Sequence, residues 1–214
     1  MISKDVRQCI REAHLYLIYT DSLSRSPIED VLVQAVRGGV DLVQIREKES
    51  ARKRLDLTRR ALEALRGMDV PVVVNDDVTI AVEAAAHGVH LGPDDLEPRY
   101  ARELLGSNMV LGLSTTTEED AQRALAAGAD YLGVGTIFAT NTKTGKRIIG
   151  PEGAARVCRG VPLPAFPIGG IDLQGAQALA RAGCRRAAVC SAILGASDVE
   201  ETAAAIRAAL TGGC

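Results

Sequence analysis

Apolar residues along this chain gather in eight short runs, and the segments between most of the runs have the spacing of amphipathic helices. The apolar positions within each run are nearly continuous, a pattern typical of parallel strands covered on both faces. The runs lie at 15–20, 42–46, 71–76, 88–92, 109–114, 131–135, 165–170 and 187–192, and the helical patterns include 26–39, 50–67 and 116–130.

Eight strands that alternate with helices predict an α/β fold, a (β/α)8 TIM barrel. No linker rich in Gly, Pro or Ser divides the sequence, so we expect residues 1–214 to form a single domain. A doubly wound open sheet is the competing prediction. The first strand is not followed by the G-x-G-x-x-G segment of nucleotide-binding sheets, which favours the barrel.

Composition and charge argue against a nucleic-acid-binding protein and against a membrane-spanning protein. A net charge of −2, with no Trp and only two Phe, gives neither the positive field nor the stacking surface of a nucleic-acid-binding protein. The longest apolar runs, such as 187–194, are too short to span a membrane. Five cysteines without C-x-x-C spacing, and no secretory pattern at the start, predict reduced thiols in a cytoplasmic protein.

A TIM barrel carries its active site at the carboxyl ends of its strands, so polar residues at those ends are the candidates for chemistry. Asp41 and Asp130 precede strands and are expected to be structural. Gln44, Arg46 and Lys48 alternate at the end of the second strand and share one side of it. A guanidinium and an ammonium together match a phosphate or pyrophosphate. Solvated charges at an exposed strand end are the alternative.

Carboxylates follow the third and fourth strands. Asp76 and Asp95 are the predicted ligands of Mg²⁺, which is commonly held by one or two carboxylates together with substrate phosphate oxygens. Asp77 and Asp94 each precede a helical segment, so turn or helix-capping roles are expected for them. Capping is also the alternative for the two predicted metal ligands.

Further candidates follow the later strands. Ser114 ends the fifth strand, where its hydroxyl either bonds an anion or caps the next helix. The polar loop 135–147, rich in Thr and Lys, is a candidate lid over a phosphorylated substrate. Gly169–Gly170 and Cys190–Ser191 end the last two strands, where this fold often binds phosphate through backbone N–H groups. These positions predict a second anion site, separate from the first.

Histidines contribute little to this prediction. His14, His87 and His90 are not spaced as metal ligands, and structural roles are favoured for them. No histidine partner for Ser114 is evident in the sequence, and there is no G-x-S-x-G elbow, so a hydrolase is disfavoured.

Seven segments, in order along nearly the whole chain, resemble thiamine-phosphate synthases: QIREK (44–48), ND (75–76), GVHLGPDD (88–95), GLS (112–114), FATNTK (138–143), IGGI (168–171) and VCSAI (189–193). The resemblance implies an Mg²⁺-dependent transferase. It would join the diphosphate of a hydroxymethylpyrimidine to a thiazole phosphate and release pyrophosphate. Its partners would be small phosphorylated molecules, and a homo-oligomer is possible in this family.

The resemblance also implies roles for individual positions. Arg46, Lys48, Ser114 and Lys143 would be catalytic. The pyrimidine diphosphate would lie against Gln44, Ile45, Arg46, Glu47, Lys48, Asn75, Ser114 and Lys143, although alternation along the strand turns Glu47 to the other side. The thiazole phosphate would lie against Thr140, Asn141, Thr142, Gly170, Cys190 and Ser191, and Asp76 and Asp95 would hold Mg²⁺.

Departures from the family pattern affect loop shape rather than charge. Pro93 stands where the family usually has Gln, Thr136 where it has Pro, and Thr115–Thr116 where it often has His or Asn. Three alternative functions remain. They are a thiazole tautomerase-like isomerase on the same barrel, a Schiff-base aldolase using Lys48 or Lys143, and a non-catalytic sensor of phosphorylated ligands.

Overall fold

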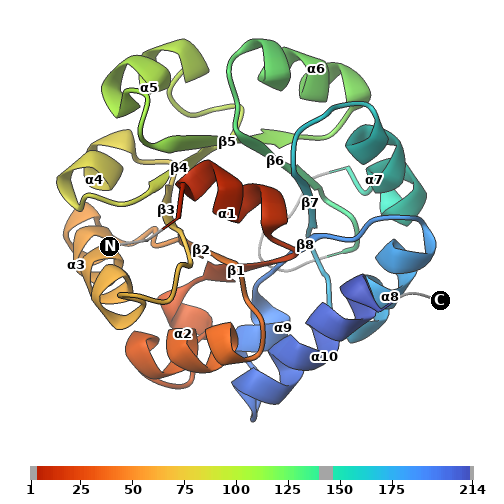
Figure 1. The fold of residues 1–214 in the computed structure, drawn as a ribbon, viewed down its shortest axis with the longest axis horizontal. Coiled ribbons are helices and arrows are strands. Elements are labelled where there is room, and N and C mark those ends of the chain that lie inside the picture. Colours follow the sequence, from red (N-terminus) through yellow and green to blue (C-terminus); the bar gives the residue numbers. More distant parts are fainter. Residues whose placement is uncertain (1–3, 140–146, 213–214) are drawn as a thin grey trace.

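Eight parallel strands close into a barrel in the computed structural model, which describes residues 4–139 and 147–212 (Figure 1). Each strand pairs with its neighbours in sequence, and the last pairs with the first through Tyr16 and Ala188. The closed ring confirms the predicted (β/α)8 barrel and excludes the open sheet. The strands are β1 (Leu15–Tyr19), β2 (Leu42–Ile45), β3 (Val72–Asn75), β4 (Gly88–Leu91), β5 (Val110–Thr115), β6 (Tyr131–Gly135), β7 (Ala165–Ile168) and β8 (Ala187–Val189).

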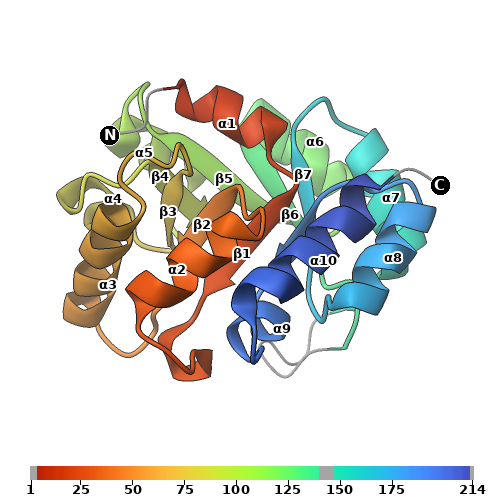
Figure 2. The same ribbon diagram turned by 60° about the horizontal axis from the view of Figure 1, so that its bottom comes forward.

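Helices form the outer layer of the barrel, and two short helices lie at its ends. The helices are α1 (Val6–Glu12), the 3₁₀ helix η1 (Asp21–Leu23), α2 (Ile28–Arg37), α3 (Ala51–Ala64), α4 (Val78–Glu83), α5 (Pro98–Leu105), α6 (Glu118–Ala126), α7 (Gly150–Arg159), α8 (Leu173–Arg181), α9 (Ser191–Leu194) and α10 (Val199–Thr211). Figure 2 shows α1 across the top of the barrel, which is its amino end, and α9 at the bottom. Among the described residues, no helix is long and apolar enough to cross a membrane.

Alternation along the strands divides the apolar residues into two cores. On β1, Leu15, Leu17 and Tyr19 pack outward against the helices, while Tyr16 and Ile18 point into the barrel. Both faces of each strand are therefore buried, which explains the nearly continuous apolar runs in the sequence. Ile10 of α1 belongs to the inner core, so this helix closes the amino end of the barrel with an apolar side chain.

The helices that follow strands begin at the carboxyl end of the barrel, and side-chain caps fix several of these starts. Asp77 accepts a hydrogen bond from the Ile80 amide at 3.0 Å, which is the capping role expected for it. Thr117 and Asp120 form a reciprocal capping box at the start of α6. These caps fix the residues at which α4 and α6 begin.

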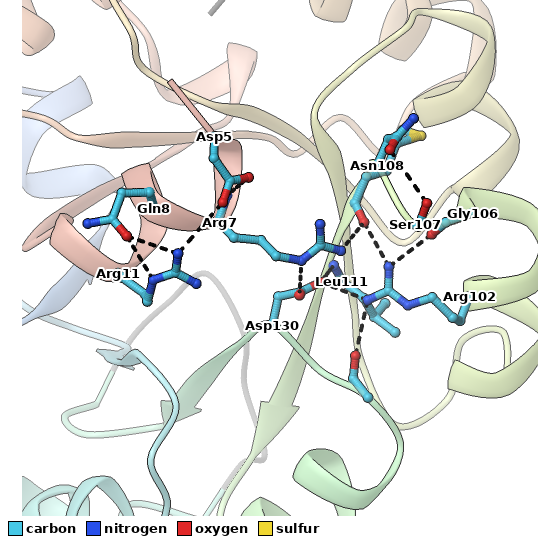
Figure 3. Close-up of polar contacts among 12 residues, drawn as sticks. Asp5, Arg7, Gln8, Arg11, Arg102, Gly106, Ser107, Asn108, Leu111 and Asp130 are labelled. Carbon is cyan, nitrogen blue, oxygen red and sulfur yellow. Dashed lines mark hydrogen bonds and ion pairs between the residues drawn. The ribbon is translucent and has the colours of Figure 1, made fainter. Parts of the chain in front are cut away.

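The amino end of the barrel is held by carboxylates paired with arginines. Asp130 accepts hydrogen bonds from Arg7 of α1 and Arg102 of α5, each at 2.7 Å, and from the Leu111 amide at 2.8 Å (Figure 3). These bonds tie two helices and two neighbouring strands to one side chain. The structural role expected for Asp130 is thus what the structure shows.

Asp41 plays the same part on the other side of the amino end. Its carboxylate accepts hydrogen bonds from the His14 and Leu15 amides, at 2.8 and 3.0 Å, and pairs with Arg207 of α10. The chain that enters β1 is thereby tied to the last helix.

Candidate active site

A cavity of about 590 Å³ opens at the carboxyl ends of the strands, and all eight strands or the loops directly after them contribute to its wall. Most of the residues chosen from the sequence meet here although they are far apart along the chain. The predicted residues that line the cavity are Gln44, Arg46, Asn75, Asp76, Asp95, Ser114, Gly170, Cys190 and Ser191.

Three other predicted residues do not line this cavity. Ile45 is fully buried in the outer core, and Lys48 is exposed on the loop after β2. Glu47 is buried, where its carboxylate accepts the Glu49 amide hydrogen at 2.6 Å and lies 3.3 Å from the Lys53 ammonium. The predicted residues Thr140, Asn141, Thr142 and Lys143 lie outside the described part of the chain.

Arg46 has an unusual environment for a cation. It is only 9 % exposed, and its Nε has no hydrogen-bond partner among the described residues. Its backbone amide donates a hydrogen bond to the Tyr19 carbonyl at 2.8 Å, which ties the end of β2 to the end of β1. Arg46 therefore lines the cavity with a side chain whose Nε–H is buried and has no partner among the described residues.

Arg46 also acts on Cys190, which follows β8, two strands away around the barrel. Burial raises the pKa of the Cys190 thiol, while a hydrogen bond with Thr20 and the positive charge of Arg46 act in the opposite direction. Cys190 follows β8, so the guanidinium lies near groups at both predicted anion positions.

Two carboxylates face the cavity from neighbouring loops. Asp76 follows β3 with a φ of 66°, a left-handed backbone conformation that is uncommon for a residue other than glycine. Its amide donates to the His90 carbonyl at 2.9 Å, so the turn is tied to β4. Asp95 follows β4, and its Oδ2 accepts the Gly92 amide hydrogen at 2.7 Å. Among the described residues, no group of three or more His, Cys, Asp or Glu side chains is placed to hold a metal ion.

A chain of hydrogen bonds runs from the cavity into the barrel. Ser114 Oγ lies 3.0 Å from His90 Nε2, and His90 Nδ1 lies 3.3 Å from the Tyr131 hydroxyl. The Tyr131 and Tyr16 hydroxyls are 3.1 Å apart, and Gln44 donates its amide hydrogen to Tyr16. Burial raises the pKa values of both tyrosines, so each hydroxyl keeps its proton.

The expectation that Ser114 lacks a histidine partner was therefore wrong. His90 is buried in the barrel and lines the cavity beside Ser114. Glycines on the next two strands make room: a Cβ on Gly112 would stand 2.2 Å from Tyr131, and one on Gly133 would stand 3.0 Å from His90. Glycines at inward strand positions are the sequence signal that could have revealed the pair.

The turn after β7 forms another part of the wall. Gly169 and Gly170 have φ values of 108° and 64°, and a Cβ at either position would stand within 2.6 Å of neighbouring atoms. Only glycine fits this turn, and it brings bare backbone to the cavity near Cys190 and Ser191.

The fold and cavity place this chain among the (β/α)8 barrels whose site lies at the carboxyl end of the barrel. The model of one family, thiamine monophosphate synthase, matches residues 15–193. The chain belongs to this family.

Named relatives agree along most of the chain. A thiamine-phosphate synthase of Haloarcula marismortui is 40% identical over 93% of this chain and 97% of its own length. One from Syntrophomonas wolfei is 41% identical over 90% of this chain and 94% of its own. A solved thiamine phosphate pyrophosphorylase from Pyrococcus furiosus superposes with a TM-score of 0.84 at 32% identity, covering 96% of this chain and 97% of its own.

Proposed function

We propose that this chain is an Mg²⁺-dependent transferase that makes thiamine phosphate. It joins a hydroxymethylpyrimidine, delivered as its diphosphate, to a thiazole phosphate and releases pyrophosphate. Membership of the thiamine monophosphate synthase family supports the reaction, and the residues in the barrel mouth supply groups that suit it. We further propose that residues 1–214 form one domain that works in the cytoplasm on small phosphorylated molecules.

The buried guanidinium of Arg46 is the single observation that carries the proposal. A buried N–H without a partner is costly and is normally satisfied by protein, water or a bound group. A pyrophosphate oxygen in the cavity satisfies it with a charge-assisted hydrogen bond, stronger than a neutral one. Since the positive charge is already desolvated, it acts on the leaving group at close to its full strength.

Asp76 and Asp95 fit the demands of Mg²⁺ at this place. The ion prefers oxygen ligands and is often held by one or two carboxylates that share it with substrate phosphates and water. The left-handed backbone of Asp76 is a strained conformation of the sort that persists at functional sites. Bound Mg²⁺ would neutralise the charge that grows on the departing pyrophosphate.

The direction of the buried hydrogen bonds determines whether the Ser114 hydroxyl can donate to a ligand. Because Gln44 donates to Tyr16, the hydrogen of Tyr16 is available to Tyr131, and that of Tyr131 to His90 Nδ1. We therefore assign the His90 proton to Nε2, from which it donates to Ser114. The Ser114 hydrogen is left to donate to an oxygen of the pyrimidine diphosphate, so Ser114 binds an anion and is not a nucleophile.

The transfer reaction needs stabilisation of the charge on pyrophosphate and close placement of the two substrates, and it needs no general base. The carbon–oxygen bond to pyrophosphate breaks, and the electron-rich pyrimidine supports the positive charge left on its methylene carbon. The thiazole nitrogen carries no proton and captures that carbon directly. Gly170, Cys190 and Ser191, with Thr140, Asn141 and Thr142, hold the thiazole phosphate beside it, which excludes water. Arg46 and Lys143 stabilise the leaving group.

The isomerase alternative has one observation in its favour. His90 lies 3.0 Å from Ser114 in the cavity wall and is a residue type suited to moving protons. An isomerase, however, acts on a thiazole phosphate alone and has no use for the buried Arg46 and the two carboxylates. The aldolase alternative has less support, because Lys48 is exposed and does not line the cavity.

Release of pyrophosphate from the two substrates tests the proposal. We expect pyrophosphate and thiamine phosphate in equal amounts when both substrates and Mg²⁺ are present. We expect neither product when one substrate is omitted or the metal is chelated. Folded protein that forms no thiamine phosphate would contradict the transferase. Isomerisation of the thiazole phosphate alone would establish the alternative.

A variant of Asp76 tests whether this residue is a ligand of the Mg²⁺ ion. Asp76→Asn keeps the shape of the side chain but removes one negative charge, so saturation with Mg²⁺ should need a higher concentration. Asp94→Asn, on the exposed part of the same mouth, is the matched control. If Asp76→Asn has the same Mg²⁺ titration as the wild type, Asp76 is not a metal ligand.

A further inference from the structure

A second cavity, of about 190 Å³, lies on the opposite side of the molecule from the barrel mouth. Cys158, at the end of α7, and Cys184, in the turn between α8 and β8, both line it. The two helices pack against each other and lie side by side in Figures 1 and 2. Arg159, Arg185 and Arg186 are also in the wall, so two thiols from distant parts of the chain share a cavity rimmed with positive charge.

The two thiols are neighbours and differ in exposure and in the direction of their pKa shifts. They lie within hydrogen-bonding reach of each other, and Cys184 is only 4% exposed, while Cys158 is partly exposed. The hydrogen bond from Cys158, helped by the charge of Arg159, lowers the pKa of Cys184. Elsewhere, burial raises the pKa values of Cys9 and Cys190. Cys184 is therefore the thiol most readily converted to a nucleophilic thiolate among these four.

We propose that Cys158 and Cys184 form a reversible oxidation site, which a small anionic disulfide converts into an intramolecular disulfide. The Cys184 thiolate attacks one sulfur of the reagent R–S–S–R, forms a mixed disulfide and expels the first RS⁻. Cys158 gives its proton to that thiolate and then attacks the Cys184 sulfur, which expels the second RS⁻. The protein loses two electrons and two protons, and the reagent becomes two RSH.

The arginines in the cavity wall favour an anionic disulfide as the reagent. Arg159 and Arg185 are exposed at the cavity, where they attract a disulfide that carries carboxylates. The nucleophile sits behind them, and its partner is already in place to resolve the mixed disulfide. The site shares no residue with the barrel mouth, so it does not depend on the proposed function.

The test uses the full chain, reduced, folded and then incubated with glutathione disulfide. After acid quenching and alkylation, trypsin releases Cys158 in the peptide VCR (157–159) and Cys184 in AGCR (182–185). We expect these two peptides joined by a disulfide, and separated again after reduction. Their recovery as alkylated free thiols, or only as separate glutathione adducts, would overturn the proposal.

Two variants identify the attacking thiol and the role of the charge. Cys158→Ser removes the resolving thiol, so glutathione should accumulate on Cys184, faster than on Cys9 or Cys190. Arg159→Gln should slow formation of the disulfide by up to about tenfold, since each unit of pKa changes the thiolate fraction tenfold. Arg181→Gln, on the exposed surface and outside the cavity wall, is the control expected to react at the wild-type rate. Each substitution removes a trypsin site, so Cys158 is followed in peptide 157–181 of the first variant and Cys184 in peptide 160–185 of the second. An Arg159→Gln rate equal to the wild-type rate contradicts the role of the rim, and absence of the Cys184 adduct contradicts the order of attack.

Discussion

The two ends of this barrel use arginine in opposite ways. At the amino end, Arg7 and Arg102 donate to Asp130 at 2.7 Å, and Arg207 pairs with Asp41. At the carboxyl end, Arg46 is buried in the cavity wall, and its Nε has no partner among the described residues. The first arrangement satisfies its own charges and joins helices to strands. At the carboxyl end, no described residue of the protein pairs with the Nε of Arg46.

This difference distinguishes charged residues that stabilise the fold from charged residues that bind a ligand. A cation whose donors are paired within the fold contributes to stability, and its loss leaves a buried carboxylate unpaired. A desolvated donor facing a cavity weakens the fold but gains a strong bond when an anion arrives. The carboxylates differ in location: Asp130 lies at the amino end of the barrel, while Asp76 and Asp95 line the cavity at the carboxyl end. Substitutions at the carboxyl end should therefore lower activity, and substitutions at the amino end should lower stability.

The largest expected effect is on catalysis, from Arg46→Ala. Turnover should fall by about a hundredfold, the usual scale for loss of one oriented group that stabilises transition-state charge. Thermal stability should stay the same or rise, because a buried donor without a partner is removed. Steady-state release of pyrophosphate and a melting curve on one sample check both parts. A wild-type rate would remove Arg46 from the site.

The next effect is on stability, from Asp130→Asn. Loss of the negative charge leaves Arg7 and Arg102 poorly paired and should lower the free energy of unfolding by about 2 kcal/mol. Activity per folded molecule should be unchanged, because Asp130 is at the other end of the barrel. Urea denaturation measures the effect, with Asp56→Asn on the exposed face of α3 as the control. Equal stability of the two variants would show that the amino-end pairs contribute little.

A smaller effect is expected from Tyr131→Phe, which removes one hydroxyl from the buried chain of hydrogen bonds. Tyr16 and His90 each lose a partner, at about 1 kcal/mol of stability. The tautomer of His90 is then held less firmly, so the direction of the hydrogen bond to Ser114 is less fixed and turnover should fall about fivefold. Tyr100→Phe on the surface of α5 is the matched control. If both variants turn over at the same rate, the chain has no part in orienting Ser114.

The smallest effect concerns the pH dependence of stability and comes from His87. Burial lowers the pKa of His87 below its usual 6.5, and its Nδ1 accepts the Val72 amide hydrogen at 2.9 Å. The unfolded chain therefore takes up a proton at a higher pH than the folded one. The neutral ring stabilises the fold above the unfolded pKa, and this contribution is lost as pH falls through the folded pKa.

Comparison of the wild type with His87→Asn isolates that contribution. The Asn amide oxygen can accept from Val72 but does not titrate, so the variant should lose less stability between about pH 8 and about pH 5. Unfolding by urea at several pH values gives the difference. Parallel curves for the two proteins would mean that His87 titrates alike in the folded and unfolded states.

The sequence predicted the barrel because hydrophobic periodicity is a local property. Each strand carries an apolar run, and alternation correctly separated Gln44 and Arg46 from Val43 and Ile45. Alternation failed at Lys48, however. The chain leaves the extended conformation after Ile45, so a residue two positions beyond Arg46 no longer shares its direction.

The His90–Ser114 pair was missed for another reason. It depends on the register between β4 and β5, where His90 lies opposite Gly112, and on the space left by glycines on β5 and β6. Neither is visible from one strand taken alone. The expectation that Ser114 has no histidine partner was wrong because strand pairing brings the two residues together.

Binding of pyrophosphate to two variants, one from each end of the barrel, tests the central claim most directly. In the presence of Mg²⁺, calorimetric titration of Arg102→Ala should give the wild-type Kd, since Arg102 belongs to the amino end. Arg46→Ala should bind at least about tenfold more weakly, the scale of one charge-assisted hydrogen bond. Equal affinities for the two variants would contradict the claim that the buried Arg46 is kept for an anion.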